Sequence, residues 1–209
     1  MADTPTTPRR RPRQKGMSFG YWVTKLVCGM FFTLGFKTRI IGVKNLPKRG
    51  AFLLASNHVS YFDPPLISGL TPSPLHFFAR KSLLKNWWFF LLHKDLNIIP
   101  VDNAGNDINA VRTAIRTLEE DKPLVIFPEG TRRPPGAPPE YRHGIAQVYS
   151  GLDVPCLPIG LNAGLYWPRR SLKLRTGKII IEILPPIPPG LDRAVFFARM
   201  QDEIEQSSN

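Results

Sequence analysis

Two short stretches of the chain combine residue types that can do chemistry. The first runs from Asn57 to Asp63 and places His58 five residues before Asp63. An imidazole titrates near neutral pH, and a carboxylate bonded to one ring nitrogen leaves the other free to take a proton from a hydroxyl. The spacing therefore predicts a general base, His58, oriented by Asp63, without a side-chain nucleophile. The alternative is a helix-capping aspartate near a surface histidine.

The second stretch is Phe127-Pro128-Glu129-Gly130-Thr131-Arg132. Glycine lets the backbone come close to a ligand, and the planar fork of an arginine suits a phosphate group. This pattern predicts a loop that binds a phosphate-bearing ligand. The alternative is an ordinary turn followed by a solvated pair, Arg132 and Arg133.

Each stretch directly follows an apolar run that is typical of a β-strand. We expect strands at residues 40–43, 51–56, 98–101, 124–127 and 156–161. Several are almost wholly apolar, which indicates a sheet buried on both faces. In such sheets, sites lie beyond the carboxyl ends of the strands, where both stretches fall.

Helical patterns lie between and after these runs. We expect helices at residues 81–93, 107–120 and 192–206, and Asp63 is expected to open another, since proline is tolerated in a first turn. Residues 171–175 and 178–184 are expected to form a hairpin. The fold class predicted is α/β: a single domain with a central mixed, largely parallel sheet flanked by helices, plus an N-terminal membrane-interfacial helix.

The composition limits the classes of partner. The chain has 209 residues, enough for one domain, and its 28 Lys and Arg against 16 Asp and Glu give a net charge of +12. This balance indicates an anionic partner, which is either nucleic acid, an anionic membrane or an anionic substrate. Cys28 and Cys156 match no metal-binding or redox spacing, which favours a reducing, cytoplasmic setting.

The N-terminal segment favours the membrane among these partners. Residues 1–16 are polar, basic and rich in proline, and are expected to form a disordered tail. Residues 17–37 carry an apolar stripe at helical spacing with polar residues opposite, which predicts an amphipathic helix in the membrane interface. Residues 1–36 are thus the expected anchor. The alternative is a helix packed on the core of the domain.

Together the two chemical stretches resemble the motifs of the glycerolipid acyltransferase family. Asn57-His58 with Asp63 matches its first motif, and residues 127–132 reproduce its Phe-Pro-Glu-Gly-Thr-Arg motif. Residues 79–102, 142–146 and 154–160 are similar to the blocks between and after them. The resemblance covers roughly residues 38–190 and defines an acyltransferase domain at 38–209.

The resemblance implies a reaction and a set of site residues. A fatty acyl group would pass from acyl-CoA or acyl carrier protein to 1-acyl-sn-glycerol 3-phosphate, giving phosphatidic acid for phospholipid biosynthesis, with His58 as base and Asp63 as its orienter. No metal or cofactor is implied. The residues expected to bind substrate are Asn57, Ser60, Arg80, Lys81, Glu129, Gly130, Thr131 and Arg132.

The same resemblance implies where the protein works and with what. Its partners would be membrane lipids, the lysophospholipid acceptor and the acyl thioester donor, at the cytoplasmic face of the inner membrane, and no nucleic acid is expected. One position departs from the family pattern: Asn103 stands where an arginine usually helps to hold the acceptor phosphate. Another lysophospholipid or a lyso-aminolipid is therefore an alternative acceptor. A non-catalytic basic membrane or nucleic-acid binding module is a more distant alternative.

Overall fold

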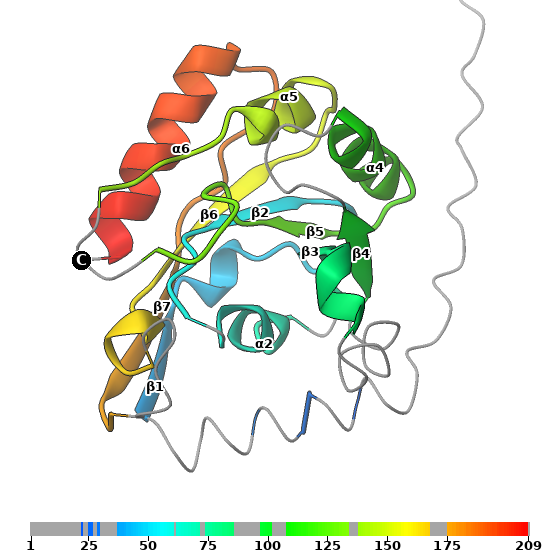
Figure 1. Ribbon diagram of the computed structural model, residues 1–209. Coiled ribbons are helices and arrows are strands. Elements are labelled where there is room, and N and C mark those ends of the chain that lie inside the picture. Colours follow the sequence, from blue (N-terminus) through cyan, green and yellow to red (C-terminus); the bar gives the residue numbers. More distant parts are fainter. Residues whose placement is uncertain are drawn as a thin grey trace, which may run out of the picture.

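The computed structural model describes Trp22, Lys25, Leu26 and Gly29, and residues 37–60, 62–71, 74–85, 97–101, 108–133, 138–167 and 175–208. A layer of strands runs through the middle of the molecule with helices on both sides (Figure 1). The four N-terminal residues described are helical. The remainder of the predicted helix at 17–37, and the tail at 1–16, lie outside the described residues.

The seven described strands form one mixed sheet. They are β1 (Lys37–Ile41), β2 (Leu53–Ser56), β3 (His76–Arg80), β4 (Ile98–Val101), β5 (Leu124–Ile126), β6 (Cys156–Leu161) and β7 (Lys178–Ile183). Their order is β1-β7-β6-β2-β5-β3-β4. Every neighbouring pair is parallel except β6 and β7. The largely parallel sheet that the sequence predicts is confirmed.

Helices cover both faces of this sheet. They are α2 (Asp63–Ser68), α4 (Ile108–Glu119), α5 (Gly144–Ser150) and α6 (Arg193–Ser208), with short 3₁₀ turns η1 (Val43–Asn45), η2 (Lys81–Lys85) and η3 (Ala163–Leu165). Figure 1 shows α4, α5 and α6 on one face and α2 on the other. Within the described residues no helix has both the length and the hydropathy needed to cross a membrane.

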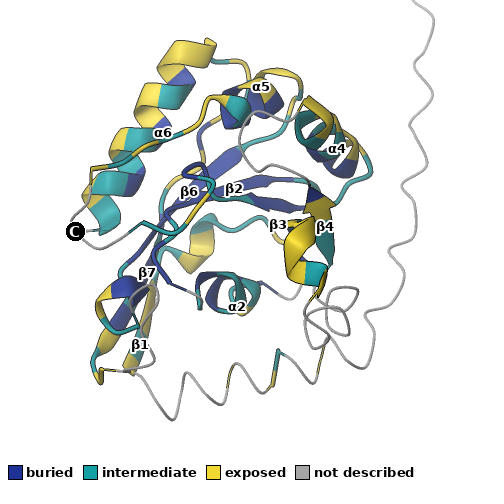
Figure 2. Cartoon of the chain, in the orientation of Figure 1, coloured by how far each residue is buried: buried dark blue, intermediate teal, exposed yellow. Residues whose placement is uncertain are grey.

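Strand β2 lies at the centre of the core and is buried on both faces (Figure 2). Side chains alternate across a strand, so Leu54 packs with Ile67 of α2, whereas Leu53 packs with Met200 of α6. The two apolar clusters thus fix β2 from both sides. Because His58 follows β2 by two residues, its backbone starts from the most constrained strand of the fold.

Most predicted elements are found with small shifts at their ends. Strands β4 and β6 have the predicted bounds, β2 and β5 lie within theirs, and α4 and α6 match the predicted helices to within two residues. Strand β1 begins earlier than predicted, and Val43 lies in η1 instead. Helix α2 begins at Asp63, as expected, with proline at its first positions.

The sequence reading did not identify β3 and α5. In β3 only Phe77 is buried, and His76 and Arg80 end the strand, so the run lacks the continuous apolar character of its neighbours. Of the helix predicted at 81–93, the described part is the 3₁₀ turn η2. Strand β7 pairs with β1 and β6, and Arg175 belongs to no strand. The remainder of the predicted hairpin partner lies outside the described residues.

Candidate active site

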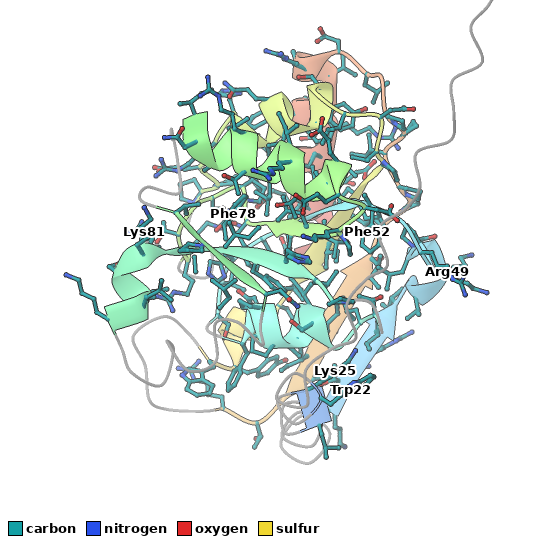
Figure 3. The ribbon with its side chains drawn as sticks, turned by 90° about the vertical axis from the view of Figure 1, so that its right-hand side faces the viewer. Trp22, Lys25, Arg49, Phe52, Phe78 and Lys81 are labelled. Atoms are coloured by element: carbon teal, nitrogen blue, oxygen red, sulfur yellow. The ribbon has the colours of Figure 1, made fainter. Side chains whose placement is uncertain are left out.

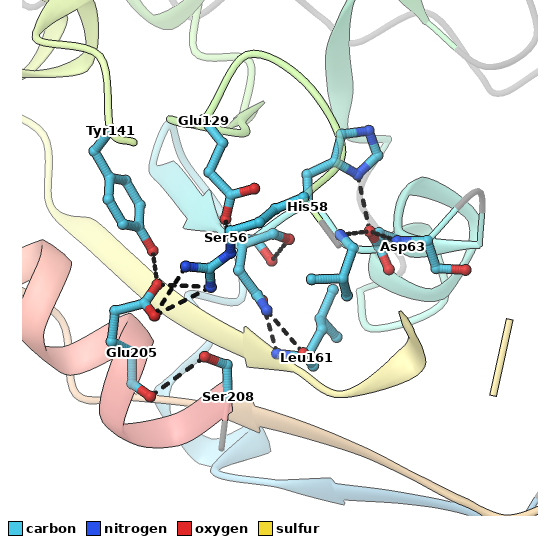
Figure 4. A network of polar contacts seen from close by, with 12 residues as sticks. Ser56, His58, Asp63, Glu129, Tyr141, Leu161, Glu205 and Ser208 are labelled. Carbon is cyan, nitrogen blue, oxygen red and sulfur yellow. Dashed lines mark hydrogen bonds and ion pairs between the residues drawn. The ribbon is translucent and has the colours of Figure 1, made fainter. Parts of the chain in front are cut away.

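His58 and Asp63 meet at the carboxyl end of β2. Their side chains are joined by a hydrogen bond of 2.8 Å between Nδ1 of His58 and Oδ2 of Asp63 (Figure 4). A carboxylate can only accept, so Nδ1 carries the proton and Nε2 keeps its lone pair. The His58 side chain is 18% exposed, whereas that of Asp63 is fully buried. This geometry leaves Nε2 as the ring nitrogen that can accept a proton.

The turn between the two residues is held by Asp63 itself. Besides His58, its Oδ2 accepts hydrogen bonds from the backbone N–H groups of Val59 and Ser60, both 2.7 Å long. Asp63 also occupies the first turn of α2, where the helix dipole favours a negative charge. The sequence spacing of five residues works because this tight turn folds the aspartate back onto the histidine.

The second chemical stretch packs directly on the first. The ring of Phe127, which follows β5, stacks on the His58 ring with centroids 4.2 Å apart and planes at 22°. The backbone N–H of Arg133 donates to the carbonyl oxygen of His58 at 2.7 Å. Gly130 turns the loop between them with a left-handed φ of 66°, a conformation that favours glycine. Strands β2 and β5 are neighbours, which explains why the two stretches meet.

Glu129 is a buried carboxylate at this junction. It is 4% exposed, and among the described residues neither carboxylate oxygen has a hydrogen bond. Burial raises the pKa of Glu129 to about 7, while Arg133 and the nearby His58 backbone lower it in part. The cation of Arg133 lies nearby, with its Nε 3.6 Å from Oε1 of Glu129. The carboxyl group can therefore change protonation state near neutral pH.

Arg133 belongs to a network that the sequence did not reveal. Its guanidinium forms a bidentate pair with Glu205 of α6, with N–O distances of 3.0 and 3.1 Å. The hydroxyl of Tyr141 donates to the same carboxylate at 2.7 Å (Figure 4). Burial raises the pKa of Tyr141, so it remains a donor. The interpretation of Arg132 and Arg133 as a solvated pair is wrong for Arg133, whose side chain is 12% exposed.

Asn57 and Ser60 fasten the first stretch to the neighbouring strand. The Asn57 amide donates to the carbonyl oxygen of Leu161 and accepts from its N–H, both at 2.8 Å. The Ser60 hydroxyl donates to the Trp167 carbonyl at 3.0 Å. Both side chains are buried. Their geometry supports a positioning role, since these contacts hold the histidine turn against the end of β6.

The other predicted binding residues lie at the same edge of the sheet. Thr131 is exposed and Arg132 half-buried in the loop after β5. Arg80 ends β3 and Lys81 begins η2, and both are exposed. Since β2, β5 and β3 are parallel neighbours, these cations follow strands that end on the side of His58. Asn103 lies outside the described residues.

Phe127 also lines a cavity of about 280 Å³ between α4 and α5. Most of the lining is aliphatic or aromatic, including Phe78, Val111 and Ile126, with Arg142 and His143 as its charged or titratable members. His143 stacks on Phe197 of α6 with centroids 4.3 Å apart. Phe127 thus contacts both the cavity and the His58 ring.

The comparisons with known proteins agree with this geometry. A family model described as Acyltransferase matches residues 37–162, more than half of the chain. The chain belongs to this acyltransferase family. It is similar to the 1-acyl-sn-glycerol-3-phosphate acyltransferase of Pseudomonas aeruginosa, with 28% identity over 175 residues, and to that of Bacillus subtilis, with 30% identity over 95 residues.

The coverage of these relatives is partial. The alignments take in 82% and 45% of this chain, and 65% and 48% of the respective relatives. Among solved structures, that of the 1-acyl-sn-glycerophosphate acyltransferase PlsC from Thermotoga maritima has a similar fold, with a TM-score of 0.75 over 89% of this chain and 77% of that one, at 24% identity. This likeness confirms the fold.

Proposed function

We propose that the protein transfers a fatty acyl group from acyl-CoA or acyl carrier protein to the free hydroxyl of 1-acyl-sn-glycerol 3-phosphate, giving phosphatidic acid. The observation that carries the proposal is the bond between His58 and the buried Asp63, which leaves Nε2 of the ring free beside the Glu129 loop. The names of the similar proteins support the substrate class.

The reaction needs a base and no covalent acyl-enzyme. Nε2 of His58 removes the proton of the acceptor hydroxyl while its oxygen attacks the thioester carbonyl, and Asp63 stabilises the resulting imidazolium. The tetrahedral intermediate then collapses, the carbon–sulfur bond breaks, and His58 returns the proton to the leaving thiolate. The described cysteine, Cys156, is fully buried, and burial raises the pKa of its thiol, so it is a poor nucleophile.

Binding of the acceptor is assigned to the loop after β5. Arg132 is suited to the acceptor phosphate, with Arg80 and Lys81 as further cations at that edge of the sheet. Glu129, Gly130 and Thr131 would contact the glycerol portion, and Asn57 and Ser60 keep the His58 turn in place. The apolar cavity behind Phe127 offers room for part of an acyl chain.

The proposal places the enzyme at a membrane surface. The N-terminal tail and the predicted interfacial helix would hold it on the anionic cytoplasmic leaflet. The exposed side chains of Trp22 and Leu26, 50% and 63% accessible, are suited to that contact. No metal or cofactor is proposed.

Product analysis tests the function. Purified protein is given a fatty acyl-CoA or an acyl carrier protein thioester together with one of several lysophospholipids, and the products are identified by mass spectrometry. We expect phosphatidic acid from lysophosphatidate. Because Asn103 replaces a usual arginine, lysophospholipids with larger head groups and a lyso-aminolipid belong in the same panel. A product from one of these alone would overturn the assignment of the head group. If no acceptor gave an acylated product, the assignment of acyl transfer would be overturned.

A further inference from the structure

Two leucines are exposed in short turns at the active-site edge of the sheet. Leu83, in η2, is 41% exposed and Leu165, in η3, is 51% exposed. Turn η2 follows β3 directly, and η3 begins two residues after β6. Both strands run in the same direction as β2. The two leucines therefore lie at the edge where the His58 turn begins.

Helix α2 and turn η3 pack on the same face of the sheet, since Leu66 and Ile67 of α2 and Ala163 of η3 belong to one core cluster. Figure 1 shows η2, α2 and η3 below the sheet, on the side away from α4, α5 and α6. Of the described N-terminal residues, Trp22 and Lys25 lie beneath α2 (Figure 3). They are fastened there by Lys25, whose Nζ donates to the carbonyl oxygen of Thr71 at 2.5 Å. The exposed side chains of Trp22 and Leu26 thus belong to the same side of the molecule.

The exposed charged residues described on these elements are all cations. Arg80, Lys81 and Lys85 are exposed. Asp63 is the only acidic residue within the described ranges 62–71, 74–85 and 160–167, and it is fully buried. A surface that combines exposed leucine and tryptophan with cations and lacks exposed carboxylates is complementary to an anionic lipid leaflet.

We propose that η2, α2, η3 and the N-terminal residues Trp22 and Leu26 form one lipid-facing surface, into which Leu83 and Leu165 insert beside the active site. We name it the η2–η3 rim. This proposal rests on the proposed function, which supplies the lipid substrate. It extends the membrane contact beyond residues 1–36, to the domain itself. The rim would bring the edge that carries His58 into the headgroup region, where a lysophospholipid presents its hydroxyl.

An acidic protein, such as an acyl carrier protein, would also be drawn to the cations of the rim. The leucines favour lipid, because they lie in two separate turns, and a bilayer accepts apolar side chains at any spacing without matching pockets. Trp22 adds a residue type that is enriched at membrane interfaces. The partner proposed for the rim is therefore an anionic lipid surface.

Vesicle binding of the full chain tests the rim without requiring turnover. The variant Leu83→Ser/Leu165→Ser is compared with Val43→Ser/Val195→Ser, a matched control whose side chains are 53% and 55% exposed in η1 and α6. Vesicles contain phosphatidylcholine with or without phosphatidylglycerol, and the bound fraction is measured by flotation. Since each inserted leucine contributes apolar area, we expect the leucine pair to weaken binding to the anionic vesicles about tenfold and the control less than about twofold.

A tryptophan variant and unfolding temperatures complete the test of the rim. Leu83→Trp/Leu165→Trp retains apolar character and should bind at least as tightly as the wild type. Unfolding temperatures confirm that the exposed changes leave the fold intact. Equal losses in the leucine pair and the control would overturn the rim, as would unchanged vesicle binding with a selective loss of affinity for acyl carrier protein. Binding that persists in a chain without acyltransfer activity would overturn the proposed function and leave the rim standing.

Discussion

At the scale of single residues, Asp63 is the centre of the site. One oxygen accepts from the His58 ring and from two backbone N–H groups, while the side chain is fully buried. This atom therefore fixes the orientation of the His58 ring, the proposed base, and shapes the turn that carries it. A neutral amide can accept some of these bonds, but it cannot stabilise an imidazolium by charge.

Asp63→Asn is accordingly expected to lower kcat by about two to four orders of magnitude, the range that a positioned general base contributes. KM for the acceptor should change much less, since no role in binding is assigned to Asp63. Steady-state kinetics with Asp202→Asn, an exposed position on α6, provide the control. A kcat close to that of the wild type would contradict the role of Asp63.

The raised pKa of Glu129 predicts that the stability of the folded chain depends on pH. Its pKa in the folded chain is about 7, above its ordinary value of 4.5, so the folded state holds this proton more tightly than the unfolded state does. The stabilisation is complete below about pH 4.5 and is lost as the pH rises through 7. From pH 5 to 8 the loss is about 2 kcal/mol.

In Glu129→Gln this contribution is absent. Urea unfolding of the variant and the wild type at pH 5 and pH 8 should therefore show the variant gaining about 2 kcal/mol relative to the wild type at the higher pH. The comparison cancels the titration of all other groups to first order. A difference between the two proteins that does not change with pH would mean that Glu129 is ionised throughout this range.

At the scale of elements, the C-terminal helix supports the loop after β5 and, through it, the His58 turn. Glu205 of α6 holds Arg133, and the backbone of Arg133 holds the carbonyl of His58. The helix approaches closely because Gly160 of β6 has no side chain: a Cβ there would lie 2.1 Å from Oγ of Ser207. The end of α6 is thus coupled to the site through one ion pair.

Glu205→Gln should destabilise the chain by about 2 kcal/mol, because it leaves the largely buried Arg133 without its bidentate partner. It should also lower kcat/KM, since Arg133 is bonded to the histidine turn. Chemical denaturation measures the first effect. The exposed pair of Arg116 and Glu120 is the control, and Glu120→Gln should cost less than about 1 kcal/mol. Equal costs at the two positions would exclude a supporting role for α6.

The elements that the sequence predicted best are the ones with an uninterrupted local signal. Strands β4 and β6 and helix α4 follow directly from their apolar patterns, and the His58–Asp63 contact spans only five residues. Strand β3 was not predicted, because a single buried phenylalanine does not distinguish a strand from a loop. Arg133 and Glu205 are 72 residues apart. No local pattern marks such a pair, so only the fold reveals it.

At the scale of the whole molecule, the cationic N-terminal part of the chain and the exposed apolar side chains of the rim lie on the same side. The chain carries a net charge of +12, and Asp63 is the first acidic residue after Asp3. The N-terminal part of the chain is therefore strongly cationic. Trp22 and Lys25 of this part lie beneath α2, on the side of the η2–η3 rim (Figure 3).

Deletion of residues 1–36 should reduce binding to anionic vesicles strongly, because the basic tail and the apolar stripe are both removed. The remaining binding should be sensitive to Leu83→Ser/Leu165→Ser if the rim also contacts lipid. Cosedimentation at low and moderate salt measures both effects. Full binding of the truncated chain would place the anchor elsewhere, and its unfolding temperature controls for the lost contact between Lys25 and Thr71.

The most direct test of the central claim is thiol release from a fatty acyl-CoA, or from the corresponding acyl carrier protein thioester, by wild type and His58→Ala, with and without lysophosphatidate. The account predicts release that requires the acceptor and falls by at least about two orders of magnitude in the variant. Acceptor-dependent release of equal rate in both proteins would contradict His58 as the base. Absence of release with either donor in the wild type would contradict the assignment of acyltransfer from these thioesters to lysophosphatidate.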